Sequence, residues 1–310
     1  MKKAWLSYLT PFTKIIFVLM LIIVGLMLAV LIGLFLTMIQ YHADMAKAIL
    51  VLSNVNDPSC IPLLKAIQIL QSVFLFIIPA LIAGTLFEQS SKGYFGMKII
   101  PSGSILLIIL IIMMVSLPLI NGLVSLNEMM KLPASLGGME KWMKETEDQT
   151  ARITEEFLDV HSMGGLAVNM LMIAILPAIG EEMIFRGLFQ RLLGEWFKNI
   201  HVAIFLAAFL FGAIHFQFYG LLPRMMLGVM FGYLYLWTGT LWAPVFAHFL
   251  NNGAAVLISY LSNTGVIHAD YEKFGYTDNI FLITGSVLFT GALLYATFVI
   301  SRRKIQNIEP

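Results

Sequence analysis

The segment from Ile15 to Ile39, IIFVLMLIIVGLMLAVLIGLFLTMI, decides the fold class of this protein. It holds no charged residue, and it is longer than the roughly 20 apolar residues with which an α-helix crosses the hydrocarbon core of a bilayer. A cleaved secretory signal would have a shorter apolar region, followed directly by a small-residue cleavage site. The segment has neither property, so we expect a transmembrane helix that stays in the mature protein.

The composition extends this interpretation to the whole chain. Of its 310 residues, 59% are apolar and 12% are charged, and the mean hydropathy is +0.87, whereas soluble domains carry about 25% charged residues. A lipid bilayer is therefore the expected environment. A net charge of +1 gives no basic surface for a nucleic-acid partner. The one cysteine, Cys60, excludes an intrachain disulfide and a cysteine-based metal site.

Apolar segments of similar character recur along the rest of the chain. Because lipid offers no hydrogen bonds to an open backbone, we expect each of them to be helical. The sequence thus predicts an all-α protein, a polytopic transmembrane helical bundle of about eight spans, with one amphipathic segment outside the membrane. The further predicted spans lie near Ile67–Phe87, Ser104–Val124, Gly165–Gly180, Val202–Phe218, Leu221–Trp237, Leu241–Leu261 and Ile280–Ile300.

The distribution of lysine and arginine predicts the orientation of these spans. With eight spans, most basic residues lie on one side, which the positive-inside rule identifies as the cytoplasm. We expect an integral protein of the bacterial cytoplasmic membrane with both termini in the cytoplasm. Lys47 and Lys65 are exceptions in the first outer loop, and Arg224 is expected at the outer interface with its charge extended toward the headgroups. The residues on the basic side are Lys2, Lys3, Lys14, Lys92, Lys98, Arg186, Arg191, Lys198, Arg302, Arg303 and Lys304.

One long polar stretch interrupts the apolar pattern between Asn127 and His161. Apolar residues recur there at three- and four-residue spacing, and charged residues take the other positions. This pattern is typical of an amphipathic helix at a membrane surface. We expect a solvated charged face, and a lid over the bundle is the alternative.

Ionisable residues at membrane depth are costly, so each of them is a candidate functional residue. Glu181, Glu182 and Arg186 follow the fourth apolar segment. On a helix, Glu182 and Arg186 lie on one face four residues apart, whereas Glu181 points about 100° away. Two adjacent carboxylates with one arginine indicate a division of roles, in which one carboxylate is structural and the other is free for proton chemistry. The alternative is that both mark the boundary between lipid and water.

Two histidines in the following apolar segments complete the polar groups at depth. A lone histidine such as His215 is more often an interhelical hydrogen-bonding residue than a catalyst. His248, however, has Asn252 four residues later on the same helix face, and together they offer donors of the kind that stabilise an oxyanion. A carboxylate, two imidazoles and an amide would serve either water activation or metal coordination. Between the histidines, Gly228 and Gly232 form a G-x-x-x-G pattern, which indicates close helix packing.

The predicted spans place these groups at different depths. Glu181 would lie near the cytoplasmic end of its span and His215 near the outer end of its own, so straight helices would separate them. Pro177 and Gly180 are positions at which the first of these helices could break. Tilted or staggered helices are the alternative.

Three motifs occur in order on three separate predicted spans. They are E-E-x-x-x-R at Glu181–Arg186, F-x-x-x-H at Phe211–His215 and H-x-x-x-N at His248–Asn252. In these residues the chain resembles the CPBP family, the CAAX proteases and bacteriocin-processing enzymes also called the Abi family. The resemblance covers Ile179 to Asn252 and does not describe the N-terminal half.

The resemblance implies an intramembrane endopeptidase that hydrolyses a peptide bond of a membrane-associated protein or peptide. Glu181 with His215 would activate the hydrolytic water, and His248 with Asn252 would stabilise the oxyanion. Glu182 and Arg186 would be the supporting pair. The family has been described both as metal-free glutamate proteases, so that no cofactor is required, and as metalloproteases. In the second description a divalent metal such as zinc would bind to Glu181, His215 and His248.

The expected organisation follows from these assignments. Residues 1–125 would hold the N-terminal transmembrane helices, 126–162 the amphipathic polar segment, 163–262 the catalytic helical core, and 263–310 a C-terminal loop and the last helix. The expected partners are a peptide or membrane-protein substrate and the lipid bilayer.

Two other functions are compatible with a polar cluster in a membrane. The first is a non-catalytic immunity or scaffold protein, in which the cluster serves interhelical packing. The second is a secondary transporter with Glu181 as the proton carrier. The transporter is disfavoured because the two halves of the sequence show no inverted repeat.

Overall fold

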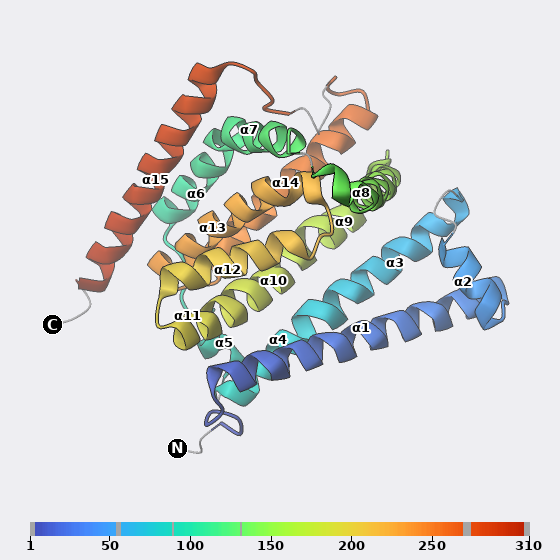
Figure 1. Ribbon diagram of the computed structural model, residues 1–310, viewed down its shortest axis with the longest axis horizontal. Coiled ribbons are helices and arrows are strands. Elements are labelled where there is room, and N and C mark those ends of the chain that lie inside the picture. The colour runs from blue at the N-terminus through green and yellow to red at the C-terminus, as the bar shows by residue number, and fades with distance from the viewer. Residues whose placement is uncertain (1–3, 54–56, 89, 131, 269–273, 307–310) are drawn as a thin grey trace.

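The computed structural model describes residues 4–53, 57–88, 90–130, 132–268 and 274–306. Within these ranges the chain forms helices and loops without any strand, which confirms the predicted all-α fold. The helices pack as a bundle, with α1 at one edge and α15 at the opposite one (Figure 1). The helices of the first half are α1 (Pro11–Tyr41), α2 (Met45–Ser53), α3 (Ile61–Ser72), α4 (Ile78–Phe87), α5 (Ser91–Tyr94), α6 (Gly103–Val115), α7 (Leu117–Glu128) and α8 (Gly137–Leu158). Those of the second half are α9 (Met163–Asn169), α10 (Leu176–Glu182), α11 (Arg191–Phe197), α12 (Ile200–Ala213), α13 (Leu221–Thr238), α14 (Trp242–Asn263) and α15 (Ile280–Gln306).

Wider π-helical turns join several of these helices end to end. The turn η2 (Val73–Ile77) links α3 to α4, and η4 (Met170–Ile175) and η5 (Met183–Gln190) link α9, α10 and α11. Two uninterrupted helices result, Ile61–Phe87 and Met163–Phe197. Three short 3-10 turns also occur, at Pro58–Cys60 (η1), Ala134–Leu136 (η3) and Phe218–Gly220 (η6).

Five of the described helices are long and apolar enough to cross a membrane, and a sixth span results if α6 and α7, which meet at 42°, are taken together. The eight predicted segments are all helical over most of their length. The difference in number lies in α12, which has only 14 residues, and in α13, where Arg224 and two tyrosines interrupt the apolar sequence.

The long helices alternate in direction, and both described chain ends lie at the same end of the bundle (Figure 1). There the Leu6 N–H donates to the carbonyl of Leu86 at 2.9 Å. The indole of Trp242 donates to the carbonyl of Met97 at 3.0 Å, and the rings of Trp237 and Phe298 are 5.6 Å apart.

The fourth predicted span was too short. It was expected to end at Gly180, but the helix continues from Met163 to Phe197 over 35 residues, so Glu181 and Glu182 lie near its middle. Neither Pro177 nor Gly180 ends the helix. Glu182 and Arg186 are tolerated inside it because they form a buried ion pair, which an apolar count along the sequence does not detect.

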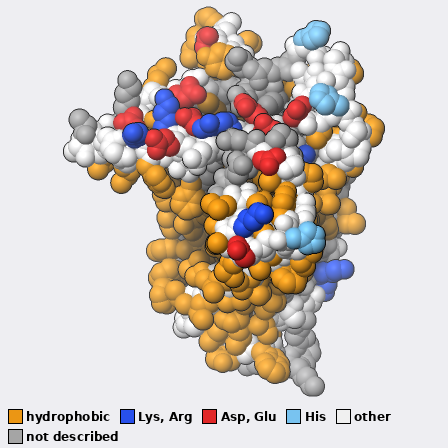
Figure 2. All heavy atoms as spheres, turned by 90° about the vertical axis from the view of Figure 1, so that its right-hand side faces the viewer, with side chains coloured by type: hydrophobic (Ala, Val, Ile, Leu, Met, Phe, Trp, Pro, Cys, Tyr) orange, Lys and Arg blue, Asp and Glu red, His pale blue; other side chains and the backbone are white. Residues whose placement is uncertain are grey.

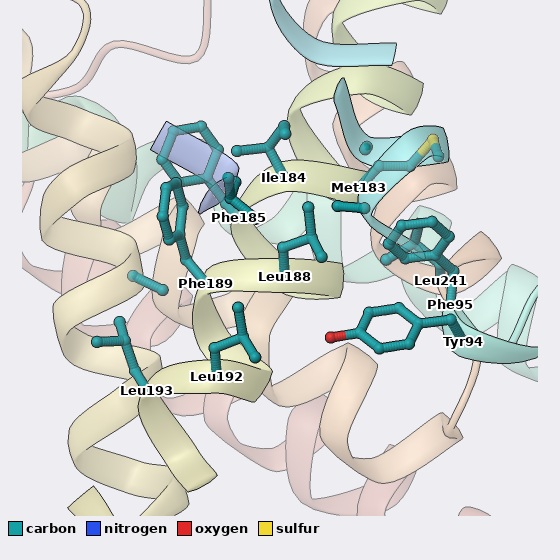
Figure 3. Packing of buried hydrophobic residues seen from close by; sticks show 14 of the residues in the cluster. Tyr94, Phe95, Met183, Ile184, Phe185, Leu188, Phe189, Leu192, Leu193 and Leu241 are labelled. Carbon is teal, nitrogen blue, oxygen red and sulfur yellow. The ribbon is translucent and has the colours of Figure 1, made fainter. Parts of the chain in front are cut away.

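A core of large side chains surrounds the second half of this long helix. Phe185 and Phe189 point to one side of η5, while Met183 and Leu188 face the aromatic residues that follow α4, as Figure 3 shows. Gly187 allows this close packing because it has no Cβ atom. A Cβ atom there would lie 2.4 Å from the ring of Phe95. A second core joins α6, α13 and α14, and the candidate site lies where these two cores meet.

The polar segment forms the amphipathic helix α8, but this helix begins at Gly137, and Asn127 belongs to α7. Its charged residues lie at the end of the bundle opposite the chain termini. Figure 2 shows charged side chains gathered above a broad band of hydrophobic ones on this face. The picture fits a bundle embedded in lipid with α8 at its surface.

Lys65 lies in α3 rather than in a loop, which corrects the sequence prediction. Its ammonium group is buried and donates to the carbonyl of Phe157, near the end of α8, at 2.8 Å, and to Oδ1 of Asn169 at 2.9 Å. Asn263 of α14 donates to the next carbonyl, that of Leu158, at 2.9 Å. The C-terminal end of α8 is thus bound to α3, α9 and α14, where a cation is favoured by the helix dipole.

Candidate active site

The predicted pair of Glu182 and Arg186 is present and buried. Arg186 Nη1 donates to Glu182 Oε1 at 2.8 Å, and the two side chains are 1% and 0% exposed. A buried ion pair is tolerated only when further groups satisfy it. Arg186 Nη2 donates to the carbonyl of Gly228 at 3.2 Å. The guanidinium also lies over the rings of Phe211, at 4.5 Å, and Phe231, at 5.3 Å, which adds cation–π attraction.

The G-x-x-x-G pattern of α13 makes this arrangement possible, and its predicted packing role is confirmed. A Cβ atom at Gly228 would lie 2.8 Å from the Cβ of Ala208 in α12, and one at Gly232 would lie 2.8 Å from Oε1 of Gln190. The Gly232 carbonyl accepts a hydrogen bond from Gln190 Nε2 at 3.1 Å. Residues 186 and 190 thus donate to the carbonyls at 228 and 232, one helical turn apart on each side.

His248 is held by the same carboxylate. Its Nδ1 lies 2.8 Å from Glu182 Oε1, an oxygen that also accepts from Arg186, so we assign the proton to Nδ1 of the histidine. The ring stacks on Phe231 with 5.5 Å between ring centres. The other nitrogen, Nε2, is left facing Asn252 and Glu181.

Asn252 lies beside His248 on α14, as the spacing of four residues predicts. Its Nδ2 is 3.2 Å from His248 Nε2 and donates to the carbonyl of Ile173 at 3.0 Å. That carbonyl lies four residues before Pro177, which has no N–H to donate to it. The proline inside the long helix therefore leaves an acceptor that orients Asn252.

Glu181 is buried like Glu182 but has fewer partners. Its side chain is 12% exposed, and its one polar contact among the described residues joins Oε2 to His248 Nε2 at 4.0 Å. The predicted division of roles stays a prediction, and the contacts differ in its direction: Glu182 has two buried partners, and Glu181 has the single contact with His248.

His215 lies at the end of α12, one residue before Phe216, whose φ of 52° turns the chain away from the helix. Its Nδ1 is 2.8 Å from the carbonyl of Phe211. A carbonyl only accepts, so Nδ1 carries the proton and Nε2 keeps its lone pair. The Phe211 ring lies edge-on to His215, at 5.4 Å, and to His248, at 5.8 Å. No contact joins His215 directly to Glu181 within the described residues.

Arg224 differs from its prediction as an interfacial residue extended toward the headgroups. It is partly buried, and its Nη2 donates to Oε1 of Gln217. Its Nη1 is buried and has no hydrogen-bond partner among the described residues. The guanidinium is near enough to act electrostatically on both Glu181 and His215.

The described residues do not form a metal-binding cluster. Nowhere in the described ranges do three or more His, Cys, Asp or Glu side chains lie close enough together to hold a metal ion. Glu181, His215 and His248 are thus not arranged as a ligand set, and we develop no step that involves a metal.

Several contacts of the cluster were absent from the sequence analysis. The backbone carbonyls of Ile173 and Gly228 have no sequence signal, because every residue has a carbonyl. Phe231 has none either, because phenylalanine is common in apolar helices. The cluster contains five predicted residues in mutual contact, Glu181, Glu182, Arg186, His248 and Asn252, with His215 connected through Phe211.

Comparison with known proteins gives a family match over this region. Residues 163–254, which include the whole cluster, match the sequence model of the family described as type II CAAX prenyl endopeptidase Rce1-like. The match confirms the predicted resemblance over these residues. No solved structure matches the chain.

Two proteins of Bacillus subtilis (strain 168) are similar to parts of the chain. "Uncharacterized protein YpbD" is 34% identical over 86 residues, which are 26% of this chain and 41% of that protein. "Putative membrane peptidase YdiL" is 30% identical over 105 residues, which are 34% of this chain and 42% of that protein. The chain therefore spans less than half the length of each of these relatives.

Proposed function

Because residues 163–254 match the CAAX prenyl endopeptidase family, we propose that this protein is an intramembrane endopeptidase. Its substrate would be a peptide bond of a membrane-associated protein or peptide. The contrast between the two adjacent carboxylates carries the proposal. Glu182 is bound by Arg186 and His248, whereas Glu181 stands free at the edge of the cluster, 4.0 Å from His248.

In the proposed reaction, Glu181 takes a proton from a water molecule whose oxygen attacks the carbonyl carbon of the scissile bond. Nε2 of His215 is a second acceptor that can orient this water, since Nδ1 donates to the carbonyl of Phe211. The proton on Glu181 then passes to the leaving nitrogen as the C–N bond breaks. The proposal requires no cofactor.

His248 and Asn252 are the proposed donors to the oxyanion. Glu182 binds Nδ1 of His248 and so directs Nε2 toward the free carboxylate, and Arg186 holds Glu182 in place. A substrate oxyanion would replace the bond between the two side chains and would accept a hydrogen bond from Asn252 Nδ2. His248 would be a second donor through Nε2 in the form that carries a proton from solvent on that nitrogen as well as on Nδ1. Donors fixed in advance in a dry site are worth more than donors that must reorient.

The proposed setting is a bacterial cytoplasmic membrane with both termini in the cytoplasm. The support for this orientation is the excess of lysine and arginine near the end of the bundle where both termini lie.

Purified protein in detergent, offered a library of membrane-anchored peptides, tests the activity. We expect cleavage by the wild type, none by Glu181→Gln, and full cleavage by the control Glu156→Gln, which changes an exposed carboxylate on α8. Cleavage that persists with a chelator fits the metal-free reaction. Full cleavage by Glu181→Gln would overturn the assignment of the catalytic carboxylate.

The buried network also favours a second candidate, a non-catalytic membrane immunity or scaffold protein that uses the cluster for packing. Under this hypothesis Glu181→Gln and His215→Gln would leave every biological effect of the protein intact. Loss of that effect in a Glu181→Gln variant that keeps its thermal stability would exclude the packing role.

A further inference from the structure

Arg224 is a half-buried cation that the proposed reaction does not use. It lies in the first turn of α13, after the loop that leads from His215. Its Nη2 donates to Oε1 of Gln217, while its Nη1 is enclosed and has no partner among the described residues. A buried N–H without an acceptor is unfavourable, and such groups in native proteins call for an explanation.

Arg186 shows what a structural arginine looks like in this same bundle. It has an ion pair with Glu182, a bond to the Gly228 carbonyl and two aromatic faces. Arg224 has none of these: within the described residues it forms no ion pair and no contact with an aromatic ring. The contacts of Arg186 therefore account for its burial, whereas Arg224 has no carboxylate in ion-pair distance within the described residues.

The carboxylates nearest to Arg224 are both engaged elsewhere or held apart from it. Glu147 of α8 acts on it electrostatically, but the Oε2 of Glu147 accepts the backbone N–H of Tyr219 at 3.2 Å. Glu181 also acts on it, but its one polar contact is with His248. A guanidinium with a free N–H beside the candidate catalytic carboxylate is a site for an external anion.

We infer that Arg224 binds a carboxylate of the peptide substrate, close in sequence to the scissile bond. The inference rests on the proposed peptidase function and narrows its substrate class. The planar guanidinium suits a carboxylate because it can donate two parallel hydrogen bonds, and Gln217 holds the side chain from one side. The carboxylate is either an Asp or Glu side chain or the C-terminal group of the peptide.

A hollow that a peptide could occupy lies near this position, on the face opposite the chain termini. A polar cavity of about 860 Å³ extends along α8, with Glu147 and Tyr219 at its wall. These two residues border the loop that precedes Arg224. Figure 2 shows acidic, basic and histidine side chains together in an opening framed by hydrophobic ones on this side of the molecule. The cavity therefore opens beside the loop that leads to Arg224.

The test compares matched membrane-anchored peptide libraries, without any substitution in the enzyme. One library carries a free C-terminus and acidic side chains, the second a C-terminal amide, and the third Asn and Gln in place of Asp and Glu. We expect one of the two neutralised libraries to raise KM by about ten-fold or more, with a smaller effect on kcat. Which library does so identifies the source of the carboxylate. Equal KM values for all three libraries would overturn the inference.

Variants then connect this preference to Arg224. Arg224→Gln should lose the preference, Arg224→Lys should keep part of it, and the control Arg152→Gln, at an exposed arginine of α8, should keep all of it. Arg224→Gln that retains the full preference would contradict the assignment.

Binding of the same libraries to the Glu181→Gln variant separates the inference from the peptidase proposal. Binding that depends on the carboxylate without cleavage by the wild type would refute the peptidase and leave the anion site. Cleavage and binding that ignore the carboxylate would refute the anion site and leave the peptidase.

Discussion

Glu181 and Glu182 are neighbours in the chain, and their side chains have different physical tasks. Glu182 is fully buried, and its Oε1 accepts from both Arg186 and His248. Glu181 is turned away by one helical step and reaches the edge of the cluster. Because the helix fixes the angle between successive side chains, a pair of glutamates is enough to give one anchored and one available carboxylate.

Substitution of Glu182 should therefore lower the stability of the protein, whereas substitution of Glu181 should lower its activity. Glu182→Gln leaves Arg186 without its counter-charge in a buried site, so we expect the free energy of unfolding to fall by about 3–5 kcal/mol. Glu181→Gln removes no hydrogen bond within the described residues and should change it by less than about 1 kcal/mol. Thermal unfolding in detergent measures both. Equal losses in the two variants would contradict the division of roles.

At the scale of elements, the absence of side chains at Gly228 and Gly232 lets α13 pack close to α12. At Gly228 the helix comes so close to α12 that a methyl group would touch Ala208, and this approach brings the Gly228 carbonyl to Arg186. The spacing of glycines in the sequence predicted close packing. It did not reveal the carbonyl as a partner of Arg186, because the two lie 42 residues apart.

Gly228→Ala should push α13 away from α12 and weaken the support of Arg186. We expect a loss of about 1–3 kcal/mol in the free energy of unfolding, together with reduced cleavage. Gly285→Ala on α15 is the matched control, since a Cβ atom there would meet nothing within 4 Å, and it should be neutral or stabilising. A Gly228→Ala protein as stable as this control would show that the close approach is not needed.

The burial of Glu147 between α8 and the loop before α13 should become less favourable as the pH rises. Partial burial raises the pKa of Glu147 above its ordinary value of 4.5. The neutral form is thus favoured in the folded state, and the stabilisation is fully present below 4.5 and is lost as the pH passes the raised pKa. Hydrogen exchange in α8 should accelerate over this interval in the wild type. In the Glu147→Gln variant, hydrogen exchange in α8 should follow only the intrinsic pH dependence of amide exchange. If this variant shows the same acceleration as the wild type, another titrating group causes the effect.

At the scale of the whole molecule, both termini share one end of the bundle, and α8 lies at the other. We expect Ser7→Cys to react with a membrane-impermeant maleimide from the cytoplasmic face only, and Glu156→Cys from the opposite face only. Buried Cys60 gives a low background in inside-out and right-side-out vesicles. Labelling of both positions from the same face would contradict the orientation.

The sequence predicted the contacts that depend on local spacing. It predicted fewer of the contacts between residues that are far apart in the chain. The pairs Glu182–Arg186 and His248–Asn252 follow from the helical repeat and were predicted. The bond from Glu182 to His248 spans 66 residues and required the fold. The length of the fourth span was underestimated because an apolar count stops at Glu181 and Glu182, although Glu182 and Arg186 neutralise each other inside the helix. The burial of Lys65 was missed because its partners lie 92 and 104 residues further along the chain, and that of Arg224 because it depends on how the loop with Gln217 folds back onto α13.

The clamp on the end of α8 has a consequence for the order in which the protein is made. Its carbonyl groups are bound by Lys65, synthesised 92 residues before Phe157, and by Asn263, synthesised 105 residues after Leu158. During translation α8 is therefore made before its partner in α14 exists. It docks fully only when α14 has left the ribosome and entered the membrane. A chain that stops before α14 keeps α8 loosely attached, so an incomplete product presents this polar helix to quality-control proteases and a finished one does not.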